Sequence, residues 1–219
     1  MPAIFTYHRI TAEPRQWRTL ATSLAQHSGA RLAEQGGRLY GLWRSQIGRP
    51  RDELQAMTVW SGAIRAREAE RLLLGVEPEV RSVASEMLLS TLRPADATPP
   101  TRQGNFAFRW FATPAEHWPE FLDLCTQAWP GFEAAYDSQV IGLWRCDKSE
   151  RDEPGRVRAL LLTRRPNLAM WERSKLPEGH DEREIRARLS RRYDLCDWTV
   201  VSTAALLTAT DRPDTARWT

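Results

Sequence analysis

The strands predicted from this sequence carry histidine and arginine side chains that could do acid–base or anion-binding chemistry. His8 lies in an apolar and aromatic segment, and an imidazole with its ordinary pKa of about 6.5 suits proton transfer at neutral pH. Beside Tyr7 or Tyr40, it could take a proton from an acidic carbon or polarise a carbonyl group. We therefore expect His8 to be a catalytic acid–base residue; the alternative is a solvent-facing histidine without a role.

Three arginines also fall within predicted strands, where a charged side chain needs a partner because an unpaired buried charge is costly. We expect Arg109 to take part in catalysis, and Arg44 and Arg145 to bind substrate. A guanidinium group can hold a carboxylate or an enolate oxygen through two parallel hydrogen bonds. The alternative is an internal salt bridge to a carboxylate such as Glu53 or Asp147.

Aromatic side chains could form the walls of a pocket for a planar ligand. The aromatic residues that we expect to bind substrate are Tyr40, Trp43, Trp60 and Trp110. Tryptophans are more often core residues, so packing is the competing interpretation. The charged run DEREIRARLSRRYD (181–194) is interpreted as a solvated helix, with Glu182–Arg186 and Glu184–Arg188 pairs four residues apart.

Composition argues against several classes of function. A net charge of +3 with nearly balanced acids and bases lacks the clustered positive charge of a nucleic-acid-binding protein. The three cysteines have neither disulfide nor metal-ligand spacing, so we expect no metal or other cofactor and a cytoplasmic protein. Haem is an alternative that an absorbance titration would test. No secretory signal or membrane span is expected, and a homo-oligomer is compatible with the sequence.

The sequence contains an internal repeat. The tetrapeptide GLWR occurs at 41–44 and again at 142–145, and the same offset of 101 residues places Trp17 on Trp118 and His8 on Arg109. Continued without a gap, this register sets Trp60 against Leu161. A repeat of this length is a small domain rather than a solenoid unit. A proline-rich stretch near 94–101 predicts the boundary between domains 1–97 and 98–219.

Each half shows the same order of predicted elements. In the first half, strands are expected at 4–10, 38–45, 54–60 and 86–92, with helices from Pro14 and at 63–74. In the second, strands are expected at 105–111, 139–146, 157–163 and 198–206, with helices from Pro114 and near 167–173 and 181–192. The order βαββαβ is that of a ferredoxin-like unit. We predict an α+β fold in which two tandem units form a pseudo-dimeric α/β barrel. Which face of each strand lines the barrel is left open.

The segment GLWRSQIGRPRDELQAMTVW (41–60) resembles the NIPSNAP family. It has the glycine-x-tryptophan pattern at Gly41 and Trp43, an isoleucine–glycine pair at 47–48, an acidic turn at 52–53 and a strand that ends in Trp60. The second half keeps Gly142 and Trp144 but lacks the isoleucine–glycine pair. The resemblance implies a dimeric α/β barrel and leaves the reaction open, because this fold supports many functions.

These features predict a small-molecule-binding barrel that could be a metal-free enzyme. The reactions considered are proton transfer, isomerisation, cyclisation and cofactor-free oxygenation of an aromatic or carbonyl substrate. The alternative is a non-catalytic binding or assembly module whose barrel is filled by its own side chains. A pocket lined by His8 and an arginine would favour the enzyme, and a closed barrel around His8 would argue against it.

Overall fold

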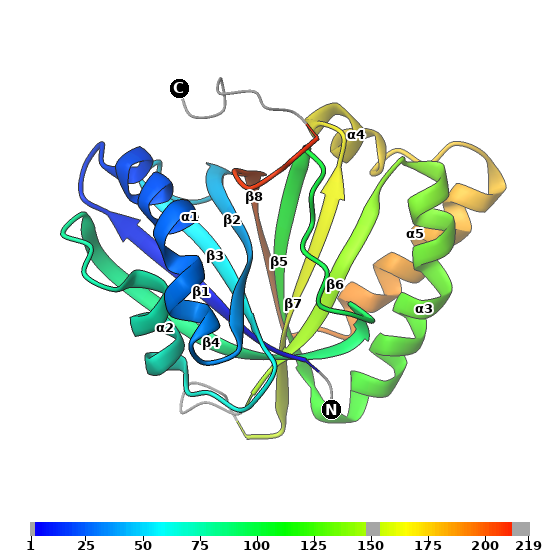
Figure 1. Cartoon of the computed structure of the whole chain (residues 1–219). Helices are drawn as coiled ribbons and strands as arrows, with labels where there is room; N and C mark the ends of the chain where they lie inside the picture. The colour runs from blue at the N-terminus through cyan, green and yellow to red at the C-terminus, as the bar shows by residue number, and fades with distance from the viewer. Residues whose placement is uncertain (1–2, 148–153, 212–219) are drawn as a thin grey trace. The chain divides into compact units, whose positions relative to one another are not determined.

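The computed structural model describes residues 3–147 and 154–211, and every predicted strand and helix is present in it. The first half contains β1 (Ile4–Ala12), α1 (Trp17–Ala33), β2 (Gly37–Ile47), β3 (Glu53–Trp60), α2 (Ala66–Leu74) and β4 (Val80–Arg93). The second half contains β5 (Asn105–Pro114), the 3₁₀ turn η1 (Ala115–His117), α3 (Trp118–Ala135), β6 (Gln139–Cys146), β7 (Arg156–Arg165), α4 (Leu168–Arg173), α5 (Gly179–Asp194) and β8 (Trp198–Leu206) (Figure 1).

The predicted fold class is confirmed. The strands follow the order β1-β3-β2-β8-β5-β7-β6-β4 of a closed barrel. The chain divides into two compact units. The first comprises residues up to Ser90, Ala95–Gln103 and the chain from Ser202, and the second comprises Thr91–Pro94 and Gly104–Val201. None of the helices that the structure describes is both long enough and apolar enough to cross a membrane.

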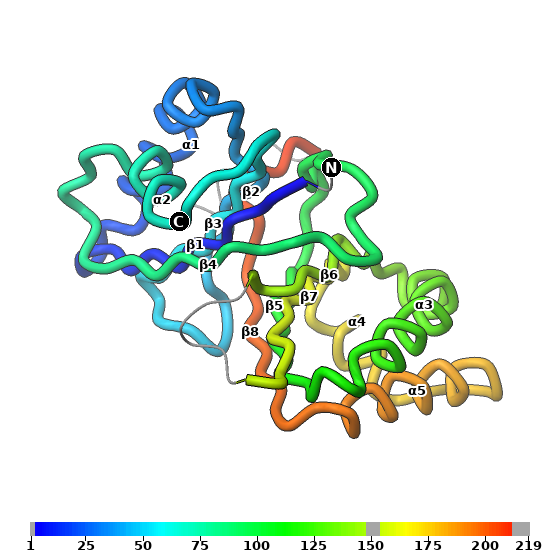
Figure 2. The backbone as a smooth tube through the Cα atoms, turned by 90° about the horizontal axis from the view of Figure 1, so that it is seen from below, coloured from blue at the N-terminus to red at the C-terminus, as the bar shows by residue number. Residues whose placement is uncertain are grey.

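In each unit a hydrophobic core joins the strands to the helices of the same unit. Figure 2 shows the backbone course of these strands and helices. In the first unit, Ile10 of β1 packs with Trp17 of α1 and Leu73 of α2. Side chains alternate along a strand, so His8 shares the face of Ile10 and Phe5 points to the other. The structure thereby settles a question that the sequence left open, because it places His8 beneath the helices of its unit.

A β-bulge in β2 puts Tyr40 on the face opposite to Leu42, although strict alternation predicts that the two share a face. The register between β2 and β3 shifts at this point. Tyr40 meets Phe5 edge to face with 5.1 Å between the ring centroids, whereas Leu42 belongs to the core beneath the helices. The extra residue of a bulge reverses the alternation, so the predicted shared face is wrong.

The gapless register between the two halves is also wrong beyond the second strand. His8 and Arg109 are 101 residues apart, and their partners across the sheet are Ala56 and Leu161, which are 105 apart. The second half therefore has four more residues between its second and third strands. Trp60 consequently corresponds to Arg165, and not to Leu161.

The GLWR repeat is explained by packing. A Cβ atom on Gly41 would overlap the ring of Trp43, and one on Gly142 would overlap the ring of Trp144. Both tryptophans are fully buried. In each half the glycine leaves room for the indole two residues later to lie flat against the strand, so the shared tetrapeptide is part of the scaffold.

We expect Gly41→Ala to lower the free energy of unfolding by about 1–2 kcal/mol, because the added methyl group must displace the buried Trp43 ring. Gly29→Ala is the matched control. Gly29 lies inside α1, and nothing lies within 4 Å of the position of its Cβ, so this change should be neutral or stabilising. Urea denaturation measures both. Equal effects of the two changes would contradict the packing role of GLWR.

Candidate functional site

The two units have different residues at three equivalent positions, and this difference defines the candidate site. Each unit has a first-strand residue and two third-strand residues on the face beneath its helices. These positions hold His8, Thr58 and Trp60 in the first unit, and Arg109, Thr163 and Arg165 in the second. In one unit they form a closed hydrogen-bonded group, and in the other they border a cavity.

In the first unit the His8 ring is fully buried and both of its nitrogens have partners. Nδ1 lies 2.9 Å from Ser85 Oγ, and Nε2 lies 3.3 Å from Thr58 Oγ1. Ser85 donates to a carboxylate oxygen of Glu70 at 2.8 Å, so its oxygen accepts the Nδ1 proton and Nε2 accepts from Thr58. Burial lowers the pKa of His8 to about 3. This arrangement holds a neutral imidazole in place, and the catalytic role of His8 stays a prediction.

Trp60 completes the closed group of the first unit. Its indole N–H donates to Thr6 Oγ1 at 3.1 Å and to Thr58 Oγ1 at 3.0 Å. The ring is 2% exposed and covers Gly37. With Gly37 and Arg38, it also borders an open hollow of about 330 Å³. In the second unit the residue that corresponds to Thr6 is Ala107, which leaves space where the first unit has a hydroxyl.

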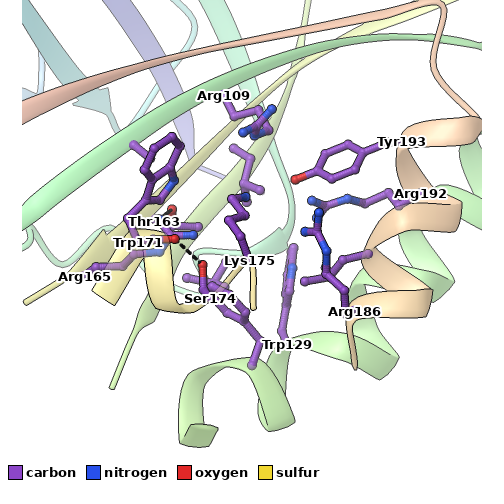
Figure 3. Close-up of a pocket in the computed structure, with 15 residues that line it drawn as sticks. Arg109, Trp129, Thr163, Arg165, Trp171, Ser174, Lys175, Arg186, Arg192 and Tyr193 are labelled. Carbon is purple, nitrogen blue, oxygen red and sulfur yellow. Dashed lines mark hydrogen bonds between the residues drawn. The ribbon is translucent and has the colours of Figure 1, made fainter. Parts of the chain in front are cut away.

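The second unit contains a cavity of about 40 Å³ between its sheet and its helices (Figure 3). The cavity is here named the basic pocket because five cationic side chains line it: Arg109, Arg165, Lys175, Arg186 and Arg192. The aromatic residues that line it are Trp129, Phe132, Trp171 and Tyr193. No carboxylate is among the lining residues, and within the part of the chain that the structure describes none of the five cations forms an ion pair.

Arg165 is the more enclosed of the two arginines that strands contribute to the basic pocket, with 6% of its surface exposed. One terminal nitrogen donates to Thr163 Oγ1 at 3.1 Å, and the guanidinium lies 5.3 Å from the Phe132 ring. Its buried Nε has no hydrogen-bond partner among the described residues. Burial and the nearby Arg109 lower the pKa of Arg165 to about 10, so the group still carries its charge at neutral pH.

Arg109 and Tyr193 form the part of the basic pocket nearest β8. Arg109 donates to Thr199 Oγ1 at 3.2 Å, and its guanidinium lies 5.2 Å from the Tyr193 ring. Burial alone would raise the pKa of Tyr193, but Arg192, Arg109 and Lys175 outweigh it and lower the pKa to about 8. The basic pocket therefore already favours a negative oxygen at its centre.

Arg192 and Lys175 supply charge from the helical side. Arg192 is 2% exposed, lies 5.1 Å from the Tyr193 ring, and donates to Cys125 Sγ at 3.5 Å. Lys175 follows α4, and its Nζ lies 5.3 Å from the Trp171 ring. Burial, together with repulsion from Arg109 and other arginines, lowers the pKa of Lys175 to about 8. The site thus combines strong anion attraction with two groups that titrate near neutral pH.

Of the predicted site residues, the structure brings only Arg109 into the basic pocket. Trp110 faces away from it, with Arg158 over its ring at 5.7 Å. Arg44 lies over the Trp17 ring at 4.0 Å, and Arg145 is exposed. The buried residues Tyr40 and Trp43 belong to the first unit. Substrate binding by these residues stays a prediction.

Sequence reasoning missed the helical side of the site. Glu182 pairs with Arg173 at 2.8 Å rather than with the predicted Arg186, whereas the predicted Glu184–Arg188 pair is present at 3.4 Å. Buried positions of α5 are Ile185, Leu189 and Arg192. Their spacing of four and three is that of a buried helix face. An arginine on such a face was the signal available in the sequence.

No metal-binding group stands out in the described ranges 3–147 and 154–211, where no three histidine, cysteine, aspartate or glutamate side chains gather. The functional groups of the basic pocket are guanidinium, amine, phenol and hydroxyl. Such groups attract anions, hold oxygen atoms and move protons.

No protein-family model and no curated protein sequence matches the chain. Solved structures do resemble it. A proposed monooxygenase from Lactobacillus acidophilus NCFM has a TM-score of 0.58 at 13% identity, over 95% of this chain and 98% of that one. An anthrone oxidase-like protein has a TM-score of 0.59 at 10% identity, over 94% and 92%.

A variant of chlorite dismutase from Candidatus Nitrospira defluvii has a TM-score of 0.56 at 8% identity, over 93% of this chain and 91% of that one. At such low identities the likeness concerns the fold. The chain has the fold of the dimeric α/β barrel proteins, with two ferredoxin-like units in a single polypeptide.

Proposed function

We propose that the protein binds a small anionic molecule in the basic pocket of its second unit. One observation carries the proposal: five cations line one small cavity that has no carboxylate. Burying a positive charge costs several kcal/mol unless a counter-charge accompanies it. A bound carboxylate or phosphate would supply that charge and could accept the hydrogen bonds that Arg165 Nε and Arg192 Nε do not make among the described residues.

Comparison of the two units supports a site rather than incidental packing. In the first unit the Trp60 ring lies at the position equivalent to Arg165, and its N–H donates hydrogen bonds to Thr6 and Thr58. The second unit has Arg165 in place of the tryptophan and Ala107 in place of Thr6. If these positions served stability alone, the second unit could have kept the hydrogen-bonded group of the first. It has buried charges there instead, which lower the stability of the fold.

The volume of the cavity limits the ligand. A cavity that holds one water molecule has a volume of about 10–15 Å³. A cavity of about 40 Å³ therefore holds a group of a few heavy atoms. A carboxylate or phosphate group with a short remainder matches this space. Trp129 and Trp171 could cover a flat ligand in contact with the arginines.

We also infer that the chain is related to the NIPSNAP family, on the basis of its GLWR-to-Trp60 segment. A metal-free enzyme is supported by the basic pocket, whose tyrosine and lysine can exchange protons near neutral pH. The competing proposal, a non-catalytic binding or assembly module, predicts binding without turnover. The hydrogen bonds at both ring nitrogens of His8 support a scaffold role for this residue under either proposal.

We expect Arg109→Gln to weaken the binding of acetate and inorganic phosphate by about tenfold or more, because one charged hydrogen-bond donor is lost. Isothermal titration calorimetry in a buffer without other anions of these kinds measures the affinities. Arg188→Gln is the control, since Arg188 lies on α5, pairs with Glu184 and does not line the pocket. Absence of saturable binding to the unaltered protein, or equal weakening by both changes, would overturn the proposal.

A further inference from the structure

We propose that Lys175 is an amine nucleophile that forms an imine with the carbonyl carbon of a small 2-oxo acid or aldehyde acid bound in the basic pocket. The inference rests on the proposed function, because the arginines would hold the carboxylate of the same ligand. It adds a substrate class, which is a carbonyl compound with a neighbouring anion, and it adds a covalent step.

Hydrogen bonds of Lys175 and of the residue before it fix the root of the Lys175 side chain. Its own N–H donates to the Glu172 carbonyl at 2.8 Å. The preceding Ser174 is buried and donates to the Trp171 carbonyl at 2.7 Å. From this turn the side chain extends into the pocket past the Trp171 ring, and the Tyr193 hydroxyl is directed toward it from α5 (Figure 3). The amine is therefore held where a bound ligand would lie.

The surroundings of Lys175 also suit a nucleophile. No described carboxylate pairs with it, and three arginines, Arg109, Arg165 and Arg186, disfavour its charged form, as burial does. An amine crowded by cations keeps a larger neutral fraction at neutral pH, and only the neutral amine attacks a carbonyl. The sequence has two lysines, Lys148 and Lys175, and the other residues in its Lys+Arg count are arginines. A guanidinium cannot take this role because it stays protonated.

The step balances within the pocket. The neutral Nζ adds to the carbonyl carbon, a proton from the Tyr193 hydroxyl reaches the carbonyl oxygen, and the amine returns a proton to the Tyr193 phenolate. Loss of one water molecule from this carbinolamine leaves a carbon–nitrogen double bond. No oxidant or reductant is needed. The ligand carboxylate stays with Arg109 and Arg165 throughout, so the carbonyl carbon is presented next to the amine.

Borohydride trapping with glyoxylate tests the inference, because glyoxylate is a small aldehyde acid and hydride transfer to its imine makes the adduct permanent. Peptide mass spectrometry then locates the adduct. At pH 7.5 we expect labelling of Lys175 to exceed that of Lys148 by about tenfold or more, since burial and the nearby arginines increase the neutral fraction of Lys175 and the pocket binds the carboxylate of glyoxylate beside it. Excess acetate should suppress labelling of Lys175 and leave labelling of the α-amino group unchanged.

Variants and controls separate this inference from the proposed function. The Lys175→Arg variant should lose the adduct whose formation acetate suppresses, and the Lys148→Arg variant should keep it. If acetate binds the unaltered protein in calorimetry but Lys175 is labelled no faster than Lys148, imine formation is wrong and the anion site stands. If acetate neither binds nor protects, the proposed function fails as well. Labelling of Lys175 that acetate does not suppress would contradict the proposed substrate class, because the imine would then form without recognition of the carboxylate.

Discussion

Arg165→Met is expected to weaken the binding of acetate and phosphate by about a hundredfold while it raises the free energy of unfolding of the ligand-free protein by about 1–3 kcal/mol. Arg165 is 94% buried (6% exposed), and its Nε has no partner among the described residues. Removing a buried charge partner from a bound anion costs several kcal/mol. In the ligand-free protein the same guanidinium pays for its desolvation and for its repulsion by Arg109, and methionine removes both costs at similar volume.

Opposite changes in affinity and stability are the signature of a residue kept for binding. Urea denaturation in a buffer free of phosphate and carboxylates measures the stability, and calorimetry measures the affinity. Arg191→Met is the control. Arg191 is an exposed residue of α5 that pairs with Glu120 at 2.9 Å, so it should change neither quantity by much. A destabilised Arg165→Met protein with unchanged affinity would show that Arg165 is structural.

The elements and the fold class follow from the sequence because hydrophobic periodicity is local. The strand at 139–146 and the strand at 198–206 have the bounds that were predicted. The errors arise where a single residue or a short insertion changes the register. The bulge at Tyr40 reverses one face of β2, and four extra residues before β7 shift the third strand of the second half.

The candidate site was predictable in one residue only. Arg109 stood out because the repeat aligned it with His8, and the 101-residue register holds for the first two strands of each half. Arg165 was hidden, because the gapless register compared Trp60 with Leu161. Lys175 comes from a turn after α4. Its approach to the sheet depends on the packing of the helices, which single-sequence periodicity does not determine.

Duplication explains why one unit could acquire a site without loss of the fold. The His8 unit keeps a closed group of imidazole, hydroxyl and indole, whose hydrogen bonds are satisfied. At the equivalent positions the second unit has Arg109, Thr163 and Arg165, which line the basic pocket. Each unit has its own core beneath its own helices, so the destabilising charges of one need not disturb the core of the other.

His8 should make the stability of the protein depend on pH. Burial lowers its pKa in the folded state to about 3, whereas an unfolded chain has the ordinary value of about 6.5. Between these values the unfolded state binds a proton that the folded state does not, so the free energy of unfolding falls as the pH falls. The contribution is absent above about pH 7 and reaches a loss of about 3 kcal/mol at pH 4.5.

Urea denaturation at pH 7.5 and pH 4.5 should therefore show a smaller loss of stability for His8→Gln than for the unaltered protein, by about 2–3 kcal/mol. Glutamine keeps a donor for Ser85 and an acceptor for Thr58 and does not titrate. His27→Gln is the control, because His27 is exposed on α1 and its change should leave the pH dependence as it was. Parallel curves for the unaltered protein and His8→Gln would mean that the imidazole is protonated in the folded state. A protonated imidazole would return His8 to consideration as an acid, because the hydrogen-bonded group around it would then have to open to admit the proton.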